Sequence, residues 1–113
     1  MKMIPVLATV LLLGGIEARA GGASNVTITQ IEAEPQGHFF LYLSSNISSS
    51  PACVTLPNDA NIFVVDGTTA GGKVVISVAQ IAYALGKTVT MSGSNLCDVH
   101  TGIETIADIF TTN

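Results

Sequence analysis

The side chains that could carry out chemistry are few, and they are scattered along the chain. Only two histidines occur, and Asp98, His100 and Glu104 make a short cluster of potential metal ligands. A zinc site needs three or four ligands with supporting hydrogen bonds, and this spacing is a common accident. Ser92 or Ser94 with His100 could be imagined as a catalytic triad, but the G-x-S-x-G motif is missing. We therefore predict no catalytic site, no metal and no cofactor, and the chain is not expected to be an enzyme.

The two cysteines predict a different kind of chemistry. Cys53 and Cys97 allow only one intramolecular pair, and C-x-x-C spacing is absent. Because a metal would need more ligands, we predict a disulfide. In the chain-entropy model such a long loop contributes about 4 kcal/mol of stability.

The first 20 residues are typical of a signal peptide. A basic start at Lys2 precedes an apolar run from Ile4 to Ile16, and Ala18-Arg19-Ala20 has the small-x-small pattern of a cleavage site. The run is shorter than the roughly 20 residues that span a bilayer, and it contains no cysteine to lipidate. A buried N-terminal helix is the alternative. We predict cleavage after Ala20, a secreted or periplasmic location, and a single domain over residues 21–113.

Charge argues against two classes of partner. Residues 21–113 contain seven acidic residues and two lysines, a net charge of about −5. Nucleic acid and anionic lipid are poor partners for such a surface, since both are bound by clustered Lys and Arg. A surface solvated by Ser, Thr, Asn and Gly suits an extracellular protein that meets neutral ligands such as sugars.

Five segments are expected to be strands. The apolar or alternating runs that predict them are residues 25–33, 38–45, 62–66, 88–94 and 103–111. The first two should form a hairpin across the turn at 34–37. For 103–111 helical spacing competes with strand alternation, and the Thr-rich end tilts the choice slightly to strand.

One helix is expected between the third and fourth strands. Val74, Val78, Ile81, Ala82 and Leu85 recur at helical spacing, and Gly86 occupies the position of a left-handed helix end. A strand is the alternative, because the segment begins with β-branched residues. We expect this face, Ile81 included, to pack on the sheet.

The order β-β-β-α-β-β predicts a mainly β fold with one helix (α+β). It is the connectivity of a small five-stranded, OB-fold-like Greek-key barrel. The early Cys53, the helix end "AYALGK", the alternating "TVTMSG" and the second Cys97 resemble small secreted bacterial proteins. These are similar to the B subunits of subtilase-cytotoxin-like and typhoid-toxin-like toxins. The resemblance implies the same fold, a glycan or host receptor as ligand, homo-oligomeric assembly and an enzymatic toxin subunit as partner.

The function expected is therefore that of an exported, non-catalytic binding module. The alternative is a structural or interaction protein of the periplasm or secreted fluid with no small ligand. A hydroxyl-rich loop beside an aromatic strand is the expected ligand-binding region; its residues are His38, Tyr42, Ser44, Ser45, Asn46 and Ser48. Asn25 and Asn46 also begin glycosylation sequons, which matter only in a eukaryotic secretory pathway.

Overall fold

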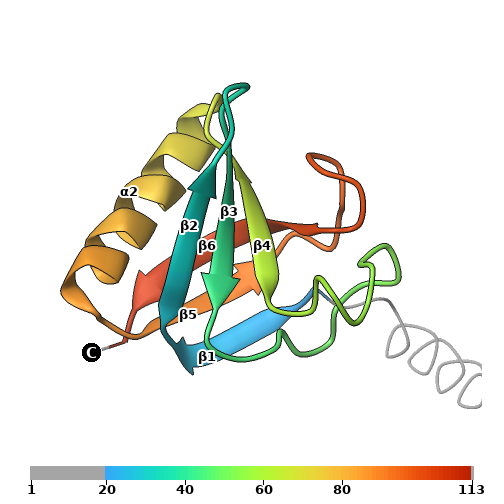
Figure 1. Cartoon of the computed structure of the whole chain (residues 1–113), viewed down its shortest axis with the longest axis horizontal. Coiled ribbons are helices and arrows are strands. Elements are labelled where there is room, and N and C mark those ends of the chain that lie inside the picture. The colour runs from blue at the N-terminus through green and yellow to red at the C-terminus, as the bar shows by residue number, and fades with distance from the viewer. Residues whose placement is uncertain (1–19, 113) are drawn as a thin grey trace, which may run out of the picture.

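The computed structural model describes residues 20–112. The predicted signal peptide, apart from Ala20, lies outside these described residues. Within this range no helix is both long and apolar enough to cross a membrane. The elements are β1 (Gly22–Val26), β2 (Ile28–Ala33), β3 (His38–Leu43), β4 (Ile62–Asp66), α2 (Ala70–Leu85), β5 (Val89–Gly93) and β6 (Glu104–Thr111) (Figure 1).

The strands form a single sheet with one parallel pair. Its order is β1-β5-β6-β4-β3-β2, and every neighbouring pair is antiparallel except β4 and β6. β1 and β2 are consecutive in the chain but occupy the two ends of this order. Figure 1 shows α2 along one side of the molecule and the loops after β3 and β5 on the other. The mainly β composition and the position of the helix before the last two strands agree with the sequence prediction.

The expected number of five strands is wrong, because the strand predicted over 25–33 is interrupted after Val26, and its first two residues belong to a separate strand that begins at Gly22. β1 pairs with β5, whereas β2 pairs with β3. Asn25 has a left-handed φ of 53°, and the N–H group of Thr27 donates to the Ser44 hydroxyl at 3.0 Å instead of to a strand. The chain therefore bends between the two segments and gives each a different partner.

The helix predicted over residues 73–85 begins about one turn earlier, at Ala70, and ends where expected. Thr69 caps its N-terminus by accepting a hydrogen bond from the Gly72 N–H at 2.9 Å. Gly86 ends it with a φ of 68°, and the Lys87 N–H returns to the Ala82 carbonyl at 2.9 Å. The prediction of a left-handed glycine at this helix end is confirmed.

The predicted buried face of the helix is wrong except at Ala82. The residues that pack inward are Gly72, Ile76, Ala79 and Ala82. Val74, Ile81 and Leu85 are instead 65%, 58% and 65% exposed. A Cβ on Gly72 would lie 1.7 Å from the Asp66 carbonyl oxygen, so the first turn of the helix approaches the end of β4 too closely for a side chain at this position. The apolar stripe, which we define as Val74, Val78, Ile81 and Leu85, therefore lies away from the buried face.

Two apolar clusters stabilise the sheet. The larger lies between the sheet and α2 and includes Leu41, Phe63, Ala79 and Met91. The smaller one contains Phe40, Ile62, Val64 and Ile103. Because side chains alternate along a strand, the two clusters occupy opposite faces of β3 and β4.

The predicted disulfide is confirmed. Cys53 and Cys97 are joined with an S–S distance of 2.07 Å and a Cα–Cα distance of 6.0 Å. The bond links the loop before β4 to the loop after β5. The last predicted segment is also settled as a strand, because Glu104–Thr111 pairs with both β4 and β5.

Candidate functional site

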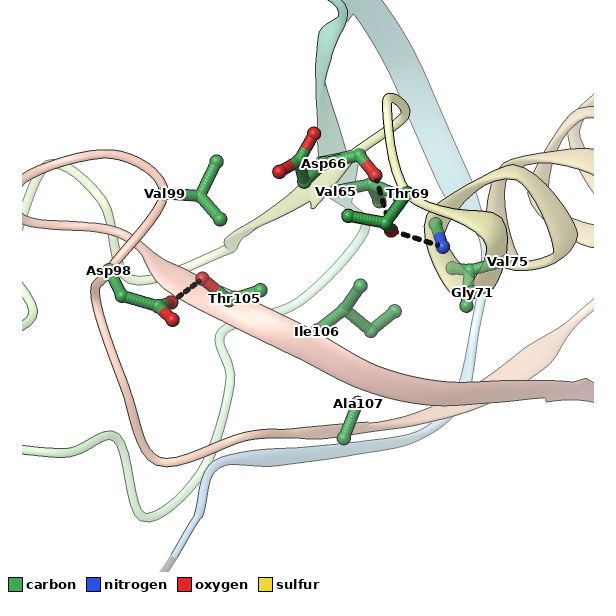
Figure 2. A pocket seen from close by; sticks show the side chains of 11 residues that line it. Val65, Asp66, Thr69, Gly71, Val75, Asp98, Val99, Thr105, Ile106 and Ala107 are labelled. Atoms are coloured by element: carbon green, nitrogen blue, oxygen red, sulfur yellow. Dashed lines mark hydrogen bonds between the residues drawn. The ribbon is translucent and has the colours of Figure 1, made fainter.

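A cavity of about 330 Å³ lies between the end of β4, the start of α2 and β6. Figure 2 shows Asp98 and Thr105 on one side of it and Thr69 with the first turn of α2 on the other. Its lining residues are Val65, Asp66, Thr69, Gly71, Gly72, Val75, Asp98, Val99, Thr105, Ile106 and Ala107.

The cavity exists because β4 and β6 pair over a short distance only. The parallel register joins Phe63 to Glu104 and Val64 to Thr105. The residues that follow on each strand, Val65 and Asp66 on one and Ile106 and Ala107 on the other, line the cavity instead. The strands thus separate at this point, and α2 covers the space from the inner side of the sheet.

Asp66 supplies a carboxylate at the end of β4. Its Oδ1 atom accepts hydrogen bonds from the Thr68 N–H at 3.0 Å and from the Thr68 hydroxyl at 2.6 Å. The side-chain bond first, then the backbone bond, lowers the pKa of Asp66 below its ordinary 3.8, against a smaller opposing effect of burial. Asp66 is therefore ionised at neutral pH, and Oδ2 remains as a further acceptor.

The helix side of the cavity is held in place by Thr69. Its hydroxyl donates to the Asp66 carbonyl at 3.0 Å and accepts from the Gly72 N–H at 2.9 Å, which connects β4 to the first turn of α2. Gly71 has no atom within 4 Å of the place where a Cβ would be. The first turn of the helix therefore borders open space at Gly71.

Asp98 and Thr105 form the opposite rim. The Thr105 hydroxyl donates to Oδ1 of Asp98 at 2.7 Å (Figure 2). Asp98 belongs to the loop after β5, whereas Thr105 lies on β6. Apolar side chains from Val75, Val99 and Ile106 form the remaining walls.

This set of groups can form hydrogen bonds and apolar contacts with a ligand. Two carboxylates and two threonine hydroxyls border an apolar surface. Carboxylates are strong acceptors for the O–H or N–H donors of a ligand.

The structure separates the ligand-binding residues predicted from the sequence. Ser44, Ser45, Asn46 and Ser48 follow the end of β3, whereas His38 begins that strand. The five steps from His38 to the end of β3 correspond to roughly 17 Å. A small ligand therefore contacts one group or the other, not both.

Tyr42 lies near the serine loop and is engaged with an acid. Its hydroxyl donates to Oε1 of Glu32 at 2.9 Å. Partial burial first, then this bond to Glu32, raises the pKa of Tyr42 above 10.0. Ser44 and Ser48 accept from Thr27 and donate to Gly22, respectively, so part of their bonding capacity is used within the fold.

His38 is the predicted residue that lies nearest the cavity rim. It stands directly opposite Asp66 in the antiparallel pair of β3 and β4. Because opposed residues point to the same face of a sheet, its ring is a neighbour of this carboxylate. Its Nδ1 atom is buried and has no hydrogen-bond partner among the described residues.

The residues first considered for catalysis do not come together. His100 packs edge-on against Phe40 at 5.1 Å, and its Nδ1 lies 2.9 Å from the Thr101 carbonyl. Glu104 is fully buried and bonded to backbone N–H groups. Ser92 bonds to Asp108 and not to His100. Across residues 20–112 no three His, Cys, Asp or Glu side chains are grouped as metal ligands.

Of the residues that line the cavity, the sequence analysis considered only Asp98, and it did so as a potential metal ligand with His100 and Glu104. The stretch Asp66–Thr69 carried a usable signal, because polar residues directly follow an apolar strand and precede a helix. Thr105 carried none, since only the path of the chain after β5 brings Asp98 and Thr105 together at this place. Comparison of the chain with protein-family models, curated proteins and solved structures found no match in any of the three.

Proposed function

We propose that this protein is an exported, non-catalytic binding module that takes a neutral, hydroxyl-bearing group, such as a sugar residue of a glycan, in the cavity. The observation that carries the proposal is the pairing of two carboxylates, Asp66 and Asp98, with an apolar wall in one concave site. Sugars present hydroxyl donors at their edge and C–H groups on their faces. Ligand pockets combine a few placed polar groups with apolar walls in the same manner.

The size and charge of the cavity restrict the class of ligand that it can bind. Its volume lies at the lower end of the roughly 300–1,000 Å³ of ligand pockets, so it suits a terminal residue of a larger molecule. The two carboxylates disfavour an anionic sugar, because no cationic side chain of the described residues lines the site to offset the repulsion. A neutral sugar does not experience this repulsion.

We further propose that the sheet is OB-fold-like. If β1 and β2 are counted as one bent strand, the order reads 1-2-3-5-4 and returns to 1, with the helix between strands three and four. This order is the support for a five-stranded, OB-fold-like Greek-key barrel. The resemblance to toxin B subunits stays a proposal.

Homo-oligomeric assembly is part of the proposal and is supported by the apolar stripe of α2. Val74, Ile81 and Leu85 are more than half exposed on a single helix. Contiguous exposed apolar side chains mark interaction surfaces on soluble proteins. A second copy of the chain would bury the same stripe on both subunits, as two-fold interfaces do.

The region around Tyr42, Ser45 and Asn46 remains a second proposed contact for a longer glycan. Ser45 and Asn46 are exposed, and the Tyr42 ring lies beside the Glu32 carboxylate. This region would add contacts outside the cavity and would not replace it.

The test is a glycan array probed with the purified mature protein, followed by titration of the best ligand. Asp66→Asn and Asp98→Asn keep the side-chain shape and remove the charge; each should weaken binding about 10-fold or more, since charge-assisted hydrogen bonds contribute about 1.5–3 kcal/mol. Tyr42→Phe is the matched control for the second region. Loss of binding in Tyr42→Phe alone would move the site to the serine loop.

A protein that binds no glycan would contradict the proposal. In that case the apolar stripe of α2 favours the alternative, an interaction protein of the periplasm or secreted fluid. Light scattering tests homo-oligomeric assembly separately. A strict monomer at high micromolar concentration would exclude it.

A further inference from the structure

Glu104 is a fully buried acidic residue outside the cavity, and the proposed function does not use it. Its side chain is 0% exposed at the start of β6. Burying a carboxylate is costly unless it is paired with a positive charge or well bonded. The arrangement of its neighbours therefore requires an explanation.

Its bonds within the described residues come from backbone N–H groups. The Gly21 N–H lies 3.2 Å from Oε1 and 3.1 Å from Oε2, so one hydrogen is shared by both oxygens. The Asn95 N–H donates to Oε2 at 2.9 Å. An ionised carboxylate has about four acceptor positions, so this set of neutral donors leaves it incompletely satisfied.

Two glycines leave room for the main chain beside the Glu104 carboxylate. A Cβ on Gly93 would lie 2.0 Å from Oε2, and a Cβ on Gly21 would lie 2.5 Å from Oε1. Glycine at both positions thus lets the main chain approach the acid. The Gly21 carbonyl also accepts from the Gly93 N–H at 2.8 Å, which fixes the nitrogen in place.

The same nitrogen is the one that the sequence predicts to become the mature N-terminus. Cleavage after Ala20 would convert the Gly21 amide into an α-amino group, which is protonated at pH 7 because its ordinary pKa is about 7.7–8.0. Ala20 is exposed and Gly21 is buried, so the predicted cleavage point is also the point where the chain enters the fold.

We propose that Glu104 is the binding site for the α-ammonium group of Gly21, and that removal of the N-terminal segment completes this site. Hydrolysis of the Ala20–Gly21 bond consumes one water, releases Ala20 as a carboxylate and leaves Gly21 with three N–H donors in place of one. Each oxygen of the Glu104 carboxylate can then accept its own hydrogen, and the contact with an uncharged amide becomes a buried ion pair. The processed protein is therefore more stable than any form that retains residues before Gly21.

The experiment compares two forms of the protein in a double-mutant cycle. One form begins at Gly21 after processing; the other retains Ala20, which moves the charge outward by a single residue. Both are prepared with Glu104 and with Glu104→Gln, and unfolding is followed in guanidinium chloride. With Glu104 the Ala20 form should show an unfolding equilibrium constant about 100-fold higher, as expected for a broken buried pair. In the Glu104→Gln background the carboxylate charge is gone, so the two forms should agree within about threefold.

A second measurement does not require any substitution of Glu104. The folded, processed protein is treated with acetic anhydride at neutral pH, and the N-terminal peptide is quantified by mass spectrometry. A bound ammonium should be acylated at least about 10-fold more slowly than in the denatured protein, whereas the exposed Lys73 should react at similar rates in both. Glu32→Gln, an exposed acid on β2, is the control and should leave the protection unchanged.

Three results would overturn the proposal. One is a mature N-terminus at a residue other than Gly21. The second is equal stability of the Gly21 and Ala20 forms when Glu104 is present. The third is an α-amino group that reacts as fast in the folded protein as in the denatured one.

Discussion

Two aspartate substitutions on α2 should distinguish its buried face from its exposed face. Ala79 is 0% exposed and Ile81 is 58% exposed, although they are two positions apart. Ala79→Asp places a carboxylate inside the larger apolar cluster with no partner, which costs several kcal/mol. A domain of this size has a total stability of about 5–15 kcal/mol, so this variant should be largely unfolded.

Ile81→Asp should leave the fold intact. The position faces away from the sheet, and substitutions at such surface sites usually change stability by about 0.5 kcal/mol or less. Guanidinium chloride denaturation, followed by far-UV circular dichroism on the oxidised protein, compares the two midpoints. Measurements at low and high protein concentration separate subunit contacts from the fold of one chain, because only the former depend on concentration.

The same variant also reports on assembly. If the apolar stripe is buried between copies, Ile81→Asp should lower the oligomeric mass seen by light scattering while each chain stays folded. A monomeric Ile81→Asp protein that unfolds as readily as Ala79→Asp would refute the placement of the helix. It would place Ile81 on the buried face, as predicted from the sequence.

Three further predictions concern the backbone, the disulfide and an acid. Gly72→Ala should destabilise the protein by about 1–3 kcal/mol, because the added Cβ would lie 1.7 Å from the Asp66 carbonyl oxygen. Gly71→Ala should be neutral or stabilising by up to about 1 kcal/mol, because its Cβ would have no atom within 4 Å. Equal melting temperatures of the two variants would contradict this prediction. Replacing Cys53 and Cys97 together by serine should cost about 4 kcal/mol for a separation of 44 residues, and an unchanged denaturation midpoint would be the opposite result. Because the pKa of Asp66 is lower in the folded protein, its ionised form should stabilise the fold fully above pH 3.8, and this stabilisation should be lost as the pH falls through the pKa of the folded state. An NMR titration of Asp66 with a midpoint above 3.8 would disprove the prediction.

The parts of the fold that follow local rules could be predicted from the sequence. The apolar run at 62–66 is β4 with the same bounds, and Gly86 ends the helix because a left-handed residue is needed there. The disulfide followed from the number of cysteines. In each case the cause lies within a few residues or in simple counting.

The parts that depend on distant neighbours could not be predicted in this way. The face of α2 was misassigned because bulky side chains such as Ile81 dominate a hydrophobic pattern, while the actual contact uses Ala79 and Gly72. Close approach selects for small residues, and an apolar scale gives these little weight. The bend at Asn25 was missed because each half of the segment remains a good strand on its own.

The candidate site belongs to this second group. Asp66 ends β4 and Asp98 lies in the loop after β5, and their place in one cavity depends on where β4 and β6 separate. The site of Glu104 has a weak signal, since Gly93 within a strand often marks a close approach of the backbone. This observation does not identify Gly21 as the partner.

The pairing of β1 with β5 has a consequence for the time course of folding. Gly22 pairs with Ser92, 70 positions later in the chain, so β1 leaves the ribosome long before its partner exists. Contacts between residues so far apart in sequence slow the folding of small domains. β1 therefore cannot pair until the last third of the chain has been made, although it is the first strand to be synthesised.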